Sequence, residues 1–330
     1  ATVGGEMRIE KLVTLEEKLK FVKMLKAKGG DTEAVAACYN HIGEVFYLHG
    51  MLNEAKQKFG MAISVMKECQ VTREDKASLG KIYSNLATVS EKLGRTQDAL
   101  THYQSSLELL QQGLGENSTD VATTLMLMGA AYLREGFVTE AVDRYKDALA
   151  MLKVTLGETH PEVTQALATL GGIFMSHGKP AAAIVMLEEA RGIMERSLPL
   201  NHPEVAVTMH SIGDAYKALG QNEQALSAYE GSLRILKAAF GPKHRDVASV
   251  LSRLGAFYSQ VGRLDEALER LKESIDVQKS SRDASRTEIA ATMNFVGGLY
   301  LRQGKQELAT EAFRDAINIV IPGDSAEVRG

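Results

Sequence analysis

Three histidines spaced 42 residues apart are the first residues whose type and spacing could do chemistry. His160, His202 and His244 lie in similar short segments, and the imidazole ring is a common zinc ligand. Zinc ligands must converge at about 2 Å from one ion, whereas equivalent positions of packed helices lie on the order of 10 Å apart. We therefore expect these histidines to cap or join helices, and we expect no metal site.

Other motifs for catalysis are not apparent in the sequence. The remaining histidines show no H-x-x-x-H or H-E-x-x-H spacing, and no G-x-S-x-G, C-x-x-C or phosphate-loop motif is found. Adjacent acids such as Glu188 and Glu189 fall on polar helix faces, where solvation is the expected role. The sequence predicts a protein that is not an enzyme and holds no cofactor.

The composition narrows the classes of partner. The chain has 330 residues, a net charge of −4 and a pI near 6.1, and a surface for nucleic acid normally shows a basic excess. No run of about 18 apolar residues exists, so we expect no membrane insertion. Two cysteines fit a reducing compartment. We expect a cytoplasmic protein, with association with the cytoskeleton left open.

Seven glycines, here called the turn glycines, give the chain a fixed period. After a first interval of 44 residues, every interval is 42. Five residues after each turn glycine comes an alanine, and the residues seven before and twelve after are always small. Such a period is the signature of stacked repeats. The turn glycines are Gly50, Gly94, Gly136, Gly178, Gly220, Gly262 and Gly304.

Each period predicts two helices joined by a turn. In residues 120–156, apolar residues recur at helical spacing up to Gly136, and a second helical run begins near Thr139. A glycine at the end of a helix suits a residue with positive φ. The small residues predict places where two helices cross closely.

This pattern resembles the tetratricopeptide repeat. In the third unit it reads Leu125, Met128, Gly129, Tyr132, Gly136, Ala141, Tyr145 and Ala148. The resemblance implies an all-α, right-handed α-solenoid of seven helix-turn-helix repeats over residues 33–321. Residues 1–32 are predicted to hold an N-terminal capping helix and linker, and residues 322–330 a polar tail. The usual repeat has 34 residues, so the period of 42 gives each unit longer helices.

The joints between units resemble those of kinesin light chains, which share the 42-residue period. The segments are residues 157–163 (GETHPEV), 201–206 (NHPEVA) and 241–248 (GPKHRDVA). Pro161 and Pro203 suit the first position of a helix, where the missing N–H is not needed. In the neighbouring joint, Ser118 and Asp120 suit the start of a helix.

The resemblance implies that the first helices of the units line a concave groove that binds a partner peptide. Polar members of this groove can hold a peptide backbone or acidic groups, and apolar members can contact apolar side chains. The predicted groove residues are Asn40, Glu44, Lys81, Asn85, Met126, Leu133, Gln165, Met175, His210, Asp214, Lys217, Arg253 and Asn294.

The function expected from this groove is that of a protein-interaction scaffold or cargo adaptor. Kinesin light chains carry an Asn-Asn pair in most first helices. Here only Asn85 matches the second asparagine, and Asn40 and Asn294 match the first. Two alternatives stay open. One is a structural subunit of a cytoskeletal or ciliary assembly, and the other is a chaperone co-factor, for which Lys81 and Asn85 form a fragment of the required clamp. The sequence identifies neither the partner nor the oligomeric state.

Overall fold

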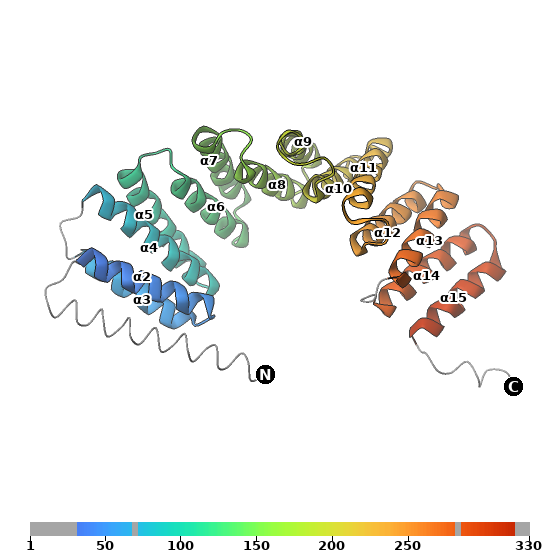
Figure 1. The fold of residues 1–330 in the computed structure, drawn as a ribbon, viewed down its shortest axis with the longest axis horizontal. Helices are drawn as coiled ribbons and strands as arrows, with labels where there is room; N and C mark the ends of the chain where they lie inside the picture. The colour runs from blue at the N-terminus through green and yellow to red at the C-terminus, as the bar shows by residue number, and fades with distance from the viewer. Residues whose placement is uncertain (1–31, 68–71, 281–284, 321–330) are drawn as a thin grey trace. The chain divides into compact units, whose positions relative to one another are not determined.

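The computed structural model describes residues 32–67, 72–280 and 285–320, and within these ranges it is entirely helical (Figure 1). Fourteen helices form seven consecutive pairs in these ranges, so the prediction of an all-α chain of seven helix-turn-helix repeats is confirmed. The predicted N-terminal helix and the polar tail lie outside the described residues. The division of the chain into leading segment, array and tail stays a prediction.

Each repeat has a first helix and a second helix. The first helices are α2 (Thr32–Leu48), α4 (Arg73–Lys92), α6 (Thr119–Arg134), α8 (Pro161–Ser176), α10 (Pro203–Ala218), α12 (Arg245–Gln260) and α14 (Arg286–Arg302). The second helices are α3 (Leu52–Lys67), α5 (Thr96–Leu114), α7 (Val138–Leu156), α9 (Pro180–Ser197), α11 (Asn222–Phe240), α13 (Leu264–Ser280) and α15 (Gln306–Val320).

The turn glycines end the first helices as the sequence predicts. All seven have positive φ, between 66° and 83°. The residue after each glycine donates its N–H to the carbonyl four residues before the glycine, as Phe137 does to Tyr132 at 2.9 Å. This bond closes a Schellman motif, which satisfies backbone carbonyls that the helix end leaves unpaired.

The joints contain a second set of left-handed residues that the sequence analysis missed. Gly115, Gly157 and Gly241 end second helices with φ between 85° and 93°, and Asn201 has φ of 66°. The signal was present, because these glycines follow the same period of 42 residues.

Side chains in the joints cap the first helices. The Nδ1 atoms of His160, His202 and His244 accept hydrogen bonds from the backbone N–H two residues later at 3.2–3.3 Å. Ser118 caps α6 by accepting from Val121 at 3.2 Å. The capping role predicted for these residues is therefore confirmed. Within the described residues, no group of three or more His, Cys, Asp or Glu side chains could hold a metal ion.

The small residues lie at close helix crossings. The alanines five residues after the turn glycines are all fully buried. A Cβ atom added to Gly213 would lie 2.6 Å from the Tyr229 ring, and one added to Gly129 would lie 2.8 Å from the Tyr145 ring. Larger residues at these positions would push the paired helices apart.

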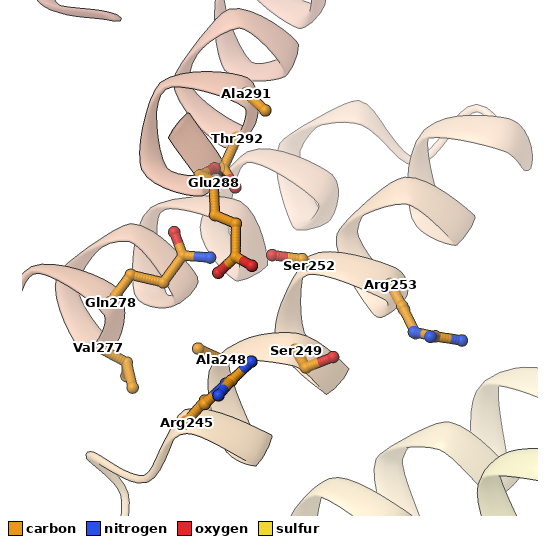
Figure 2. Close-up of a pocket in the computed structure, with 10 residues that line it drawn as sticks. All are labelled: Arg245, Ala248, Ser249, Ser252, Arg253, Val277, Gln278, Glu288, Ala291 and Thr292. Carbon is orange, nitrogen blue, oxygen red and sulfur yellow. Dashed lines mark hydrogen bonds between the residues drawn. The ribbon is translucent and has the colours of Figure 1, made fainter. Parts of the chain in front are cut away.

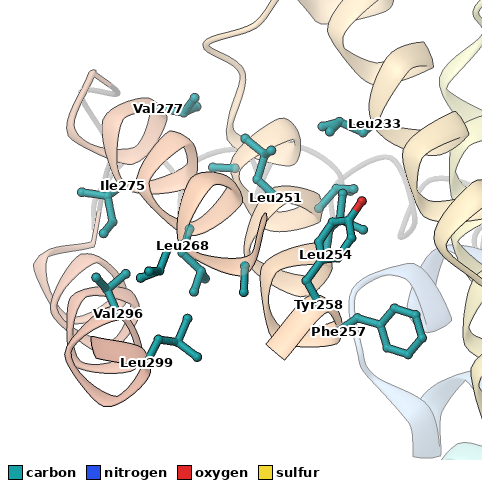
Figure 3. Packing of buried hydrophobic residues seen from close by; sticks show 14 of the residues in the cluster. Leu233, Leu251, Leu254, Phe257, Tyr258, Leu268, Ile275, Val277, Val296 and Leu299 are labelled. Carbon is teal, nitrogen blue, oxygen red and sulfur yellow. The ribbon is translucent and has the colours of Figure 1, made fainter. Parts of the chain in front are cut away.

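The described residues divide into two compact units, the first ending at Ala166 and the second beginning at Leu167. In each, the two helices of a repeat pack together, and a second helix also packs against the first helix of the next repeat. Figure 3 shows side chains of α12, α13 and α14 meeting in the core of the second unit, among them Leu251, Leu268 and Val296. Among the described helices, none is long and apolar enough to cross a membrane.

Candidate partner-binding face

The residues ten, nine and six positions before each turn glycine define what we call the first-helix face. In the first compact unit, three of them form a hydrogen-bonded cluster. Asn40 donates to the Glu44 carboxylate at 2.8 Å within α2. Asn85, from α4, donates to the Asn40 amide oxygen at 3.0 Å and to Glu44 at 3.1 Å. These bonds tie two successive first helices together.

The same three positions form a cluster in the second compact unit. There His210 and Asp214 lie on α10, and Arg253 lies on α12. An Arg253 Nη1 donates to His210 Nε2 at 3.2 Å, and the Asp214 carboxylate lies 3.9 Å from the same nitrogen. The structure thus brings together six of the predicted groove residues as two equivalent clusters, one in each unit.

His210 is held as a neutral ring. Its Nε2 accepts from the arginine, so the ring proton sits on Nδ1, which is buried and has no hydrogen-bond partner among the described residues. Burial lowers the pKa of His210, and the Arg253 charge lowers it further, against the opposing effect of Asp214. The Tyr229 hydroxyl donates to Asp214 at 2.6 Å, and burial followed by this bond raises the tyrosine pKa.

Two predicted basic groove residues already have partners in the chain. The Lys81 ammonium lies 2.9 Å from the Asp120 carboxylate, which begins the next first helix. The Lys217 ammonium lies 5.4 Å from the centre of the Phe257 ring, in cation–π range. Both side chains are exposed, so each can still reach a ligand at the cost of these contacts.

The predicted apolar groove residues are only partly buried. Met126 and Leu133 are half-buried on α6. Met175 is also half-buried, but it packs against the hydrophobic cluster around Ala183, Leu187 and Ile212, so much of its surface serves the core. The predicted polar residues Gln165 and Asn294 are exposed.

A cavity of about 360 Å³ opens beside Arg253. It is lined by α12, the end of α13 and the start of α14. Figure 2 shows the Glu288 carboxylate pointing into it toward Ser252, with Arg245 and Ser249 on the opposite side and Arg253 pointing away. Such a mixture of a carboxylate, a guanidinium group and hydroxyls suits a polar segment of a ligand.

Sequence reasoning missed a buried carboxylate next to the first cluster. Glu91 is 9% exposed, and it accepts from the Tyr103 hydroxyl at 3.1 Å and pairs with Arg134 at 2.9 Å. The equivalent residues of the last two repeats also form a bond: Arg302, equivalent to Arg134, donates at 2.8 Å to the hydroxyl of Ser259, which is equivalent to Glu91. The repeat could have identified Glu91, because it stands three residues before a turn glycine, as the predicted groove residues Leu133 and Met175 do.

The fold and this face define a helical-repeat protein built from hairpins of two helices. The description "tetratricopeptide repeat" matches residues 78–153, 120–196, 178–238, 204–280 and 246–320. The chain belongs to the tetratricopeptide repeat family. Proteins of this family are generally scaffolds for protein–protein interaction and are typically not enzymes.

Several solved structures are similar in fold. BtubC (BKLC) from P. vanneervenii is 23% identical, with a TM-score of 0.60 over 70% of this chain and 92% of BtubC. Kinesin-light-chain-type, nearly identical TPR-like repeats from Podosopora anserina are 23% identical, with a TM-score of 0.54 over 63% of this chain and 99% of the repeat protein.

A third similar structure is the C-terminal part of a TPR repeat-containing protein from Cytophaga hutchinsonii. It is 14% identical, with a TM-score of 0.62 over 87% of this chain and 97% of that one. At these identities the likeness concerns the fold alone. No curated protein sequence matches the chain.

Proposed function

We propose that this protein is an interaction scaffold, of the adaptor kind, that binds a partner peptide along the first-helix face of each compact unit. The observation that carries the proposal is the repetition of one cluster geometry. Residues ten and six before a turn glycine meet the residue nine before the next one, both at Asn40, Glu44 and Asn85 and at His210, Asp214 and Arg253.

The two clusters keep binding capacity that a peptide can use. The Asn85 amide nitrogen donates both of its described hydrogen bonds, to Asn40 and to Glu44. Its amide oxygen can therefore accept a hydrogen bond from a peptide N–H. Arg253 is exposed and carries five N–H donors, of which one is directed at His210. A peptide carbonyl or carboxylate fits the remaining donors.

The two clusters differ in the side chains that they favour. The first contains amides that donate to the Glu44 carboxylate, with His41 3.4 Å from the same carboxylate, so it suits a peptide backbone better than an acidic side chain. The second presents Arg253 on α12 and the exposed Lys217, which lies about one turn after Asp214 on α10. Acidic side chains of the partner therefore belong in the second unit. The half-buried Met126 and Leu133 offer apolar contact in the first unit.

An adaptor role of the kinesin-light-chain type is the form of this function that we favour. Its support is the pattern of the His-Pro joints and the period of 42 residues. The first-helix face departs from the Asn-Asn pairs of those proteins, so the peptide bound here is expected to differ in sequence from their cargo.

The test uses peptides selected from a displayed library against the full chain. Replacing both Asn85 and Arg253 by alanine should weaken the binding of these peptides at least about fivefold, because each lost hydrogen bond contributes roughly 1 kcal/mol. Fluorescence polarisation measures the affinity, and circular dichroism checks that the variant keeps its helical fold at the temperature of the binding experiment.

The matched control replaces Asn53 and Arg234 by alanine. These residues are exposed on second helices, one in each compact unit, and the change removes the same two side-chain types. The control should bind the selected peptides like the unmodified chain. If the control loses binding while the Asn85/Arg253 variant keeps it, the peptide lies on the second helices and the proposal is wrong.

A further inference from the structure

A second cavity, of about 290 Å³, lies on the other side of the last repeats, between the second helices α13 and α15. We call it the α13–α15 groove. Its floor is apolar and is built by Ile275 on α13, by Met293, Val296 and Tyr300 on α14, and by Ala312 on α15. Ile275 and Val296 are labelled in Figure 3, where they edge the core of this unit.

Charged side chains surround this floor. Asp276, Glu311 and Asp315 contribute three carboxylates, and within the described residues none of them forms an ion pair. Lys272 is the one cation in the lining, and its ammonium lies 5.4 Å from the centre of the Tyr300 ring. The groove therefore combines an apolar, aromatic floor with a net negative rim.

In two earlier repeats, an arginine of the chain itself stands at the position equivalent to Ala312. Eight residues after their turn glycines stand Arg144 and Arg270, and eleven residues after stand Asp147 and Glu273. Arg144 pairs with Asp147 at 3.4 Å, and Arg270 pairs with Glu273 at 3.3 Å. In both arginines the Nε atom is buried, so the side chain lies against the helices rather than in solvent.

The last repeat keeps the acid but lacks the arginine. Asp315 stands eleven residues after Gly304, where Asp147 and Glu273 stand in their repeats, but the residue eight after Gly304 is Ala312. The α13–α15 groove occupies the space beside this alanine. The repeat thus provides a template for what can fill the groove, namely an arginine side chain whose guanidinium meets the acid.

In a third groove an arginine also lies beside acids, but it comes from the preceding second helix. Between α9 and α11 the equivalent cavity also has an alanine, Ala228, eight residues after its turn glycine. There Arg191, from the preceding second helix, lines the cavity and pairs with Glu188 at 2.6 Å and Glu195 at 2.9 Å. The residue equivalent to Arg191 in the last groove is Ile275, so no arginine reaches it from that side either.

We infer that the α13–α15 groove binds an arginine side chain presented by a partner protein or peptide. The stem of that arginine packs on Met293 and Val296, and its guanidinium pairs with Asp315, with Glu311 on the same helix. The Tyr300 ring offers a stacking surface that suits a planar guanidinium better than an ammonium. Lys272 must move off the ring for this to happen. The inference is independent of the proposed function, because it concerns the second helices.

The test follows the methyl signal of Met293 by NMR in the full chain labelled at methionine methyl groups. The probes are the peptide acetyl-Leu-Arg-Leu-amide and its counterpart with citrulline, which has the same shape without the charge. Only the arginine peptide should shift the Met293 signal in a saturable way. Equal shifts by both peptides, or no shift at millimolar peptide, would overturn the inference.

Variants place the arginine within the chain. Ala312→Arg introduces the arginine that stands at this repeat position as Arg144 and Arg270. It should fill the groove and weaken the binding of the arginine peptide at least tenfold. Thr310→Arg adds the same charge at an exposed site of α15 outside the groove lining, and this variant should bind the arginine peptide with unchanged affinity.

A milder substitution keeps the result decisive if Ala312→Arg disturbs folding. Asp315→Asn removes the expected partner of the guanidinium and retains the shape of the side chain, so it should weaken the arginine peptide at least threefold. Undiminished binding by a folded Ala312→Arg or by Asp315→Asn would show that the peptide does not use this groove.

Discussion

At the scale of single residues, the two clusters on the first-helix face share positions but differ in chemistry. In the first unit the bonds run between amides and a carboxylate. In the second unit a neutral imidazole accepts from an arginine. Protonation of His210 would remove this acceptor and place two positive groups at 3.2 Å. In the second cluster, a change in the charge of His210 therefore changes the hydrogen bonding directly. His41 lies 3.4 Å from the Glu44 carboxylate at the edge of the first cluster.

This difference predicts how stability depends on pH. Burial holds the pKa of His210 below its ordinary value of 6.5, and the Arg253 charge acts in the same direction, while the Asp214 carboxylate opposes them. The Tyr229 ring packs against the imidazole at an angle of 49°. The unfolded chain then binds a proton more tightly than the folded one. The histidine's contribution is complete above pH 6.5 and is lost as the pH falls toward the lowered value. The free energy of unfolding, measured with denaturant, should decrease between pH 7.5 and 5.

The control for this prediction is His210→Gln, whose side-chain oxygen can still accept from Arg253 without titrating. Other groups also respond to pH, so the comparison is between the slopes of the two proteins. The variant should lose less stability on acidification than the unmodified chain. Identical slopes would mean that His210 does not carry the effect.

The sequence located the positions of the two clusters better than their contacts. It placed Asn40, Asn85, His210 and Arg253 on one face, because the period fixes where each residue lies on its helix. It did not show that Lys217 covers Phe257, because that contact joins two repeats and depends on how their helices pack. Pairings between repeats follow from side-chain conformations that a single period does not encode.

At the scale of the helices, glycines of one chain have opposite roles according to their backbone conformation. Gly136 ends α6 with φ of 83°, a region that L side chains enter at a cost. Gly60 lies inside α3, and a Cβ atom added to it would meet nothing within 4 Å. The sequence distinguishes them, since only Gly136 belongs to the period of turn glycines.

Alanine substitution should therefore change stability in opposite directions at these sites. Gly136→Ala should destabilise the protein by about 1–2 kcal/mol, the cost of a left-handed residue with a side chain. Gly60→Ala should stabilise it by about 0.5–1 kcal/mol, because alanine loses less entropy in a helix. Denaturant unfolding measures both. A change of the same sign in the two variants would contradict the conformations described for them.

At the scale of the whole molecule, the chain consists of repeats that contact mainly their neighbours. Six of the seven described second helices pack closely against the first helix of their own repeat, and most second helices also pack against the next first helix. The sequence predicted seven such repeats, but it gave no sign that the chain divides into two compact units within α8. The spacing of small residues is uniform along the repeats, so it carries no mark of this division.

A repeat array of this kind should respond locally to a packing defect. Ala141, in α7, is fully buried at a helix crossing. Ala141→Leu should overpack that crossing and destabilise the protein by about 1–3 kcal/mol. Hydrogen exchange followed by mass spectrometry should show faster exchange in α6 and α7 and unchanged exchange in α12–α14 of the other compact unit.

The matched control is Ala150→Leu, which makes the same change at an exposed position of the same helix. It should shift stability by no more than about 0.5 kcal/mol and leave exchange unaltered. Faster exchange in all helices of the Ala141→Leu variant would mean that the two compact units unfold as one cooperative body. Exchange that is faster only near α7 would mean that a partner bound to the second unit is insulated from defects in the first.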